Sequence, residues 1–207
     1  MLKHSVTAIF AALIISLLGI GNGYAKLSVN PRISFDKIPD NVEDFLKIRD
    51  NLADTPQGGA TVFVVALTVY SRNQSLGEDF LTIALDTSRL RRVTPGGYDG
   101  WEPSPDFITS ARLLLTHPWT TRSYIEGTSP LNGYKIPDRN PLSCYFDPLR
   151  TQMTDSITAN VYIHSSGDNS SRLIVMRKNN RGIWKALNPN GLFIQTRHPV
   201  YTADDGI

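Results

Sequence analysis

The segment that most constrains the fold is ATVFVVALTVY at residues 60–70. It is apolar at nearly every position and lacks the polar face of a surface helix, so we expect it to be buried on all sides. Its valines and threonines also suit a buried strand, but the run continues past Tyr70 without a break, and this length favours a helix. Thr55 and Pro56 supply an N-cap and a first helical residue before it. The sequence therefore predicts a buried central helix.

Two glycines, Gly58 and Gly59, lie in the first turn of this helix. Glycine lowers helix stability, so a compensating interaction is expected at this position. One explanation is the close approach of another backbone, and the other is an anion bound by free N–H groups at the helix start. Packing is the commoner use of such glycines, and we favour it here.

Residues 1–25 have the organisation of a secretory signal peptide. Lys3 gives a basic start, Val6–Ile20 is apolar, and Gly23 and Ala25 place small residues before a cleavage site. The apolar run is shorter than the roughly 20 residues that a membrane span needs, which disfavours a retained anchor. We expect an exported protein, periplasmic or secreted, with no membrane span after signal cleavage.

The charge of the mature chain bears on its partners. The whole sequence has a formal net charge of +2, and removal of residues 1–25 takes away Lys3 and no acidic residue. A nearly neutral chain argues against nucleic acid as a partner. The remaining partners that we expect are another protein or a small molecule.

The part before the central helix contains one further helical pattern. Residues 26–39, with two prolines, form an extended lead-in. Asp40 is then the expected N-cap of a helix, with Glu43 three residues later completing a capping box, and an apolar stripe continues to about Ala53.

Helical patterns also follow the central helix. Ser75 and Glu78 have the spacing of a capping box, and so few residues separate this helix from the central one that the two should form a helical hairpin. Ser104 and a following proline begin another helix, which His117 and a proline end. Residues 119–126 add a short helix before a long loop.

From Leu142 onward the pattern becomes strand-like. Val161 and Ile163 alternate with Tyr162 and His164, as in a half-buried antiparallel strand. Short loops rich in glycine and asparagine separate the runs, which indicates a meander. The expected strands are Leu142–Phe146, Ile157–Ser165, Arg172–Lys178, Ile183–Ala186 and Leu192–Gln195.

Helices followed by strands are typical of the α+β class. We predict an N-terminal layer of about four to five helices packed on a C-terminal antiparallel β-meander of about four to five strands. The predicted organisation is a signal peptide (1–25), an extended lead-in (26–39), a single α+β domain (40–198) and a loose tail (199–207). Within the domain, the helical part spans 40–127 and the β part spans 142–195.

Several longer motifs resemble an exported bacterial domain family of unknown function. They are TPQGGATVFVVAL, TIALD, GYDGW, RSYIEGTSPLNGY and SSGDNSSRLIVMRKNNRGIWKA. The resemblance covers residues 39–197 and implies a helical N-terminal half followed by a β C-terminal half. It assigns no activity, ligand or functional residue.

The sequence carries no pattern of an established catalytic or metal site. It lacks the G-x-S-x-G elbow, H-x-x-x-H, C-x-x-C and phosphate-binding glycine loops, so no cofactor and no metal are expected. Cys144 is the only cysteine, and its apolar neighbours favour a buried, inert thiol. The alternative is a nucleophile, for which His164 is the best-placed histidine. Cys144 and His164 are thus the catalytic candidates.

A binding role is the prediction that remains. Aromatic residues with an arginine at loops and element ends are typical of binding sites, although they can also fix one layer to another. The candidates are Tyr98, Trp101, Trp119, Arg122, Tyr124 and Tyr134. We predict an exported, non-enzymatic binding or interaction module. The alternative is a small hydrolase with a site around Arg122, Tyr124, His164 and Cys144.

Overall fold

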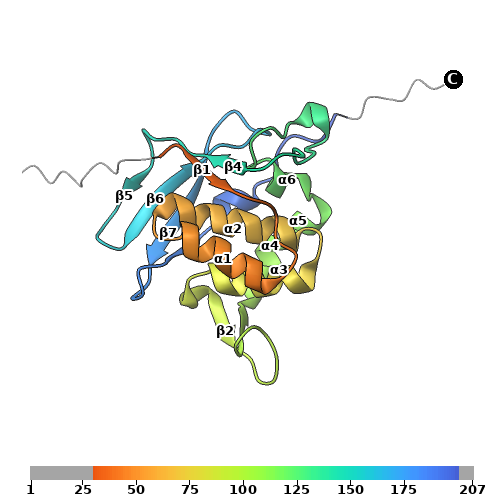
Figure 1. The fold of residues 1–207 in the computed structure, drawn as a ribbon. Coiled ribbons are helices and arrows are strands. Elements are labelled where there is room, and N and C mark those ends of the chain that lie inside the picture. Colours follow the sequence, from red (N-terminus) through yellow and green to blue (C-terminus); the bar gives the residue numbers. More distant parts are fainter. Residues whose placement is uncertain (1–29, 201–207) are drawn as a thin grey trace, which may run out of the picture.

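The computed structural model describes residues 30–200, so the predicted signal peptide and most of the predicted loose tail lie outside the described part of the chain. Helices α1 (Val42–Leu52), α2 (Pro56–Tyr70) and α3 (Gln74–Ala84) pack together at the centre of the fold (Figure 1). A four-stranded sheet lies against α2. The predicted α+β class is confirmed.

Helix α2 is the buried central helix that the sequence predicts. Every one of its residues is buried, and the Thr55 hydroxyl accepts a hydrogen bond from the Gly58 amide at 3.1 Å. A Cβ atom at Gly58 would lie 1.7 Å from the carbonyl oxygen of Leu52, and one at Gly59 would lie 2.7 Å from the Trp184 Cβ. The two glycines therefore let neighbouring elements approach α2, as the packing explanation requires.

The caps of α1 and α3 differ from the predictions. Asn41, not Asp40, caps α1, and its side-chain oxygen accepts from the Asp44 amide at 2.9 Å. Asn73, not Ser75, caps α3, and its side chain accepts from the Leu76 amide at 3.2 Å. In both cases the side chain that reaches the third helical amide is an asparagine one or two positions from the predicted cap. The sequence pattern alone does not distinguish these neighbouring residues, because all of them can cap a helix.

The helix predicted after Ser104 is broken in two. Helix α4 (Pro105–Ala111) begins at the predicted cap, and the chain restarts after Arg112 as α5 (Leu113–Thr116). The next helix, α6 (Trp119–Arg122), is shorter than predicted. The chain leaves it because the Glu126 amide donates to the Ser143 carbonyl at 2.9 Å, across to a strand instead of along a helix.

The main sheet is an antiparallel meander in the order β5-β6-β7-β8. Its strands are β5 (Gln152–Met153), β6 (Thr158–Ile163), β7 (Arg172–Lys178) and β8 (Trp184–Asn188). The alternation predicted for β6 is confirmed, since Val161 and Ile163 are buried and Tyr162 is half-buried. The strand predicted at 192–195 is wrong. A 3-10 helix occupies Asn190–Phe193, and its Gly191 lies directly against the β7 backbone at Leu173.

The predicted lead-in contains a strand. β1 (Arg32–Phe35) pairs antiparallel with β4 (Leu142–Tyr145), with Ile33 opposite Cys144. We call this two-stranded unit the β1–β4 ribbon. It continues into the main sheet because the His164 amide donates to the Tyr145 carbonyl at 2.8 Å. The sequence predicts β4 as the first strand of the meander. In the structure β4 pairs with β1 instead, and the meander begins at β5.

A hairpin projects from the body on the side away from the ribbon (Figure 1). Its strands, β2 (Leu90–Arg92) and β3 (Trp101–Pro103), were not predicted. Arg92 lies opposite Trp101, and its guanidinium sits 4.3 Å from the centre of the Trp101 ring.

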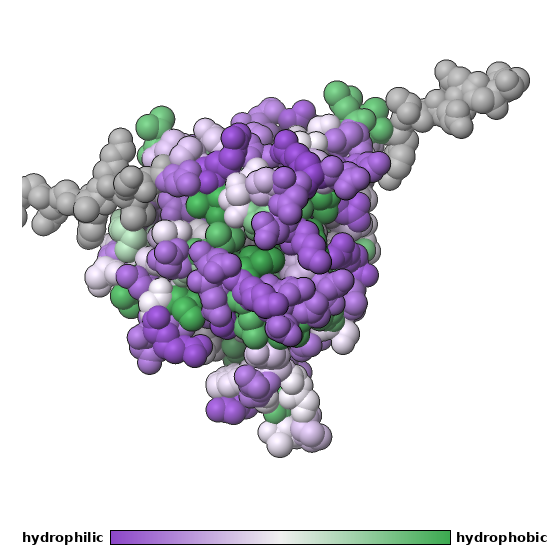
Figure 2. Space-filling model, viewed as in Figure 1, coloured by the Kyte–Doolittle hydropathy of each residue, from purple (hydrophilic) through white to green (hydrophobic). Residues whose placement is uncertain are grey.

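The surface on the face shown in Figure 2 is mainly hydrophilic, and its apolar residues form small separate patches. None of the helices within residues 30–200 is long and apolar enough to cross a membrane.

Candidate functional site

A cleft of about 350 Å³ lies where the helical part meets the β1–β4 ribbon and the end of β6. We call it the junction cleft. One wall is the irregular segment that follows α6, and the opposite wall is formed by the ends of β1, β4 and β6. The lining residues are Arg32, Ser123, Tyr124, Ile125, Glu126, Gly127, Thr128, Tyr145, His164 and Ser166.

An ion pair lines one end of the cleft. Arg32 donates two hydrogen bonds to the Glu126 carboxylate, from Nε at 2.7 Å and from Nη2 at 2.9 Å. The Ser143 hydroxyl donates a third at 2.5 Å. Burial disfavours the charged carboxylate, but these hydrogen bonds prevail and hold the pKa of Glu126 below its ordinary value. The cleft therefore presents a fixed guanidinium beside an ionised carboxylate.

Hydroxyl groups form the helical wall. The side-chain oxygens of Thr128 and Ser166 lie 3.0 Å apart, and the Ser166 hydroxyl also lies 3.1 Å from the Ser123 carbonyl oxygen, to which it donates. The Ser123 and Ser165 hydroxyl oxygens lie 2.8 Å apart. These contacts hold the loop after β6 against the segment after α6. They place hydroxyl oxygens that can accept hydrogen bonds along one side of the cleft.

Two rings form the outer rim. Tyr145 ends β4 and His164 follows β6, and their ring centroids lie 6.4 Å apart in an edge-to-face arrangement. Both residues are exposed. The rim thus offers an aromatic surface that solvent reaches.

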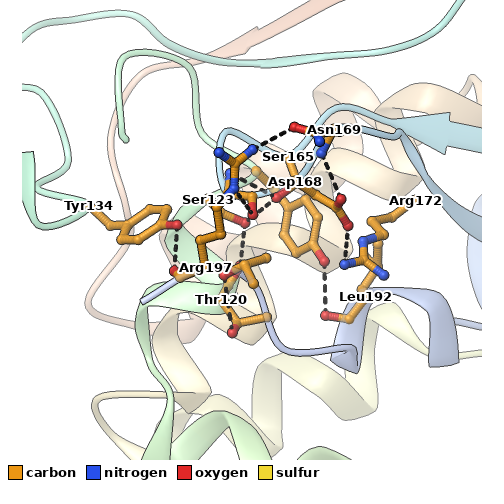
Figure 3. A network of polar contacts seen from close by, with 12 residues as sticks. Thr120, Ser123, Tyr134, Ser165, Asp168, Asn169, Arg172, Leu192 and Arg197 are labelled. Atoms are coloured by element: carbon orange, nitrogen blue, oxygen red, sulfur yellow. Dashed lines mark hydrogen bonds and ion pairs between the residues drawn. The ribbon is translucent and has the colours of Figure 1, made fainter. Parts of the chain in front are cut away.

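A polar network adjoins the cleft at Ser123, which lines it (Figure 3). The Tyr124 hydroxyl donates to the Leu192 carbonyl at 3.0 Å, and the Tyr134 hydroxyl donates to the Arg197 carbonyl at 2.7 Å. Arg197 in turn donates to the Asn169 side chain at 2.7 Å. Burial raises the pKa of Tyr124, so its phenol stays protonated as a donor. The C-terminal segment is therefore tied to the loop that carries Ser166.

The structure brings together only some of the predicted binding residues. Tyr124 lines the cleft, while Tyr134 lies in the adjoining polar network and is buried. Arg122 precedes the lining segment and is half-buried, and it does not line the cleft. Trp119 packs 4.9 Å from the His117 ring and 5.1 Å from the His198 ring, measured between centroids.

The other two predicted binding residues lie elsewhere. Tyr98 and Trp101 belong to the projecting β2–β3 hairpin, where they form an isolated bridge with each other. They do not contribute to the junction cleft.

The four residues of the predicted hydrolase site do not converge. Tyr124 and His164 line the cleft, but Cys144 faces the core from β4 and is fully buried. Burial raises the pKa of the Cys144 thiol to about 12, so no thiolate forms at neutral pH. Within residues 30–200, no group of three or more histidine, cysteine, aspartate or glutamate side chains is placed to hold a metal ion.

Sequence reasoning missed most of the cleft's polar residues. Arg32 lay in the supposed lead-in, and Glu126 lay in a supposed helix. Tyr145 and Ser166 appeared as ordinary strand and turn residues. The one sequence signal for this wall of the cleft was RSYIEGTS at residues 122–129, which is part of a family motif. That motif indicates no ligand and no reaction.

Comparison with known proteins identifies a family. The model of a family described as "Domain of unknown function (DUF6935)" matches residues 37–200. No curated protein and no solved structure matches the chain.

Proposed function

The chain belongs to the DUF6935 family, a domain of unknown function, and from its junction cleft we propose that it is an exported protein that binds a small polar ligand without converting it. The observation that carries the proposal is the convergence of unlike polar groups in one concave site. A guanidinium, a carboxylate, two hydroxyls and an aromatic rim face a cleft of about 350 Å³. Few, well-placed polar groups in a pocket of this size are typical of ligand sites.

The hydrogen bonding of the cleft favours binding over catalysis. The Thr128 hydroxyl contacts the Arg122 and Ile125 carbonyls, the Ser166 hydroxyl contacts the Ser123 carbonyl, and the two hydroxyls contact each other. Neither is bonded to His164. Among the described residues, the His164 ring has no hydrogen-bond partner that would orient it as a base. A serine nucleophile needs a hydrogen-bonded and oriented base. The groups present are suited to hold a ligand.

Export is the second part of the proposal, and it rests on the sequence of residues 1–25. The measurement is the intact mass of the protein recovered from the exported fraction. We expect a chain that begins at Lys26. A full-length chain retained in the membrane fraction would contradict this part.

Native mass spectrometry of residues 26–207, purified gently from the exported fraction, tests the binding role. We expect a bound small molecule that is retained in the His198→Ala variant and lost in Tyr145→Ala and His164→Ala. His198 is the control because it is an exposed histidine outside the cleft. If the purified protein carries no ligand, thermal-shift screening of polar metabolites identifies one, and the same variants are then compared with that ligand.

Two results would overturn the proposal. One is a ligand that stays bound to both cleft variants. The other is turnover of a ligand that is abolished by a single polar substitution in the cleft, because this would show an enzyme.

A further inference from the structure

A second cavity, of about 390 Å³, adjoins the junction cleft. It is lined by Arg32, Ser34, Glu126, Arg139, Asn140, Pro141 and Ser143. Arg32 and Glu126 line both cavities. The ion pair between them is thus a shared boundary, with one cavity on each side.

Both cavities lie over the same face of the β1–β4 ribbon. Side chains alternate between the two faces of a strand. Ile33 and the opposite Cys144 pack towards the core, so Arg32 and Ser34 of β1 point outward. Tyr145, opposite Arg32, lines the junction cleft, and Ser143, opposite Ser34, lines the second cavity. The two cavities therefore follow one another along the ribbon as a single groove.

The groove offers side-chain groups that suit hydroxyls along its length. Beyond the ion pair, the second cavity adds the Arg139 guanidinium, the Asn140 amide and the Ser34 hydroxyl. Arg139 also donates to the Glu126 carbonyl at 3.4 Å. The planar guanidinium and amide groups and the hydroxyl match a ligand built of repeated units, each of which carries both hydrogen-bond donors and acceptors.

The position of the groove disfavours an extended peptide that adds to the ribbon as a strand. An extended peptide that adds to a sheet gains affinity by pairing its main chain with a free strand edge. The groove runs over a face of the ribbon, and the backbone groups between β1 and β4 already pair with each other. Recognition here must come from side chains, and an aromatic rim at Tyr145 supplies a surface for the apolar face of a sugar ring.

We propose that the two cavities form one groove for an oligosaccharide, with at least one sugar unit on each side of the Arg32–Glu126 pair. This inference rests on the proposed binding function and names its ligand class. Each cavity alone has a volume at the small end of the roughly 300–1,000 Å³ found for ligand pockets. A single cavity therefore holds only a short piece of the oligosaccharide.

The test compares ligand length. Monosaccharides, disaccharides and tetrasaccharides of hexoses and N-acetylhexosamines are titrated into residues 26–207 by calorimetry. We expect a tetrasaccharide to bind at least about tenfold more tightly than its monosaccharide, because the second cavity adds contacts to a tethered unit. Arg139→Ala and Asn140→Ala should remove this advantage and leave monosaccharide binding within about twofold. His164→Ala should weaken ligands of every length.

The control is Arg181→Ala, which removes an exposed arginine that lies in the turn before β8 and lines neither cavity. Thermal unfolding of each variant shows that it is folded. Equal affinity for short and long sugars, with no effect of Arg139→Ala, would overturn the groove and leave the junction cleft as a binding site. Binding of peptides or of small acids but no sugar would overturn the ligand class. Absence of binding by any polar ligand would overturn the proposed function as well.

Discussion

Gly77 allows a direct test of how closely α2 and α3 pack. A Cβ atom at Gly77 would lie 2.1 Å from the Tyr70 Cα and 2.4 Å from its amide nitrogen. Real Cβ atoms essentially never approach other heavy atoms to under 3.0 Å, so a Gly77→Ala variant must separate the two backbones by about 0.9 Å, the difference between 3.0 and 2.1 Å. Tyr70 ends α2 and is fully buried, which leaves it little room to move.

Two opposing effects set the magnitude. Alanine in place of glycine favours a helix by about 1 kcal/mol. Forcing extra volume into a packed core costs about 1–3 kcal/mol, and the upper value applies where the opposing atoms are backbone. The variant should therefore lose about 2 kcal/mol of unfolding free energy, which for a chain of this size lowers the Tm by about 4–8 °C.

Thermal and urea unfolding of residues 26–207, followed by circular dichroism, measures this loss. Gly133→Ala is the control, because its added Cβ meets no atom within 4 Å and its φ is +63°. The control should lose only about 1 kcal/mol, from the left-handed backbone alone. A Gly77→Ala variant as stable as the wild type, or more stable, would refute the close packing of α2 and α3.

Three further predictions follow from single contacts. Hydrogen bonds lower the pKa of Glu126 in the folded state. The ionised carboxylate therefore stabilises the fold at pH values above its pKa in the unfolded chain, and this stability is lost as the pH falls through its pKa in the folded chain. Urea unfolding of Glu126→Gln should thus show a deficit at pH 7 that shrinks towards pH 3, whereas a constant deficit would contradict the ion pair with Arg32. Asn41→Ala should lower stability by about 1 kcal/mol in the same assay, and Asp40→Ala should leave it unchanged if Asn41 is the cap. The Cys144 thiol should resist a thiol reagent in the native protein and react in urea, and rapid reaction without denaturant would contradict its burial.

The parts of the fold that depend on local chemistry could be predicted from the sequence. Helix α2 was found because its residues are apolar on every side, and β7 was found at its observed bounds because turn residues enclose an apolar run. The caps at Asn41 and Asn73 were missed because several residues that can cap stand side by side. The local pattern identified the helix but did not select which side chain reaches the third amide.

The parts that depend on distant pairing could not be predicted. β1 is only four residues long and gains its partner more than a hundred residues later, so no local pattern marks it as a strand. The β2–β3 hairpin was obscured because its connection holds several glycines and resembles an open loop. Short strands of this kind are stabilised by the rest of the fold and not by their own propensity.

The same physical reason explains why the candidate site was mostly missed. Arg32 and Glu126 are 94 positions apart in the chain, and nothing near either residue indicates the other. Arg32 also precedes residues 37–200, which are the residues that match the family. One half of the ion pair that separates the two cavities is therefore supplied by the segment taken for a lead-in. Because this segment also pairs with β4, the site is complete only when the chain before the matched domain has folded onto it.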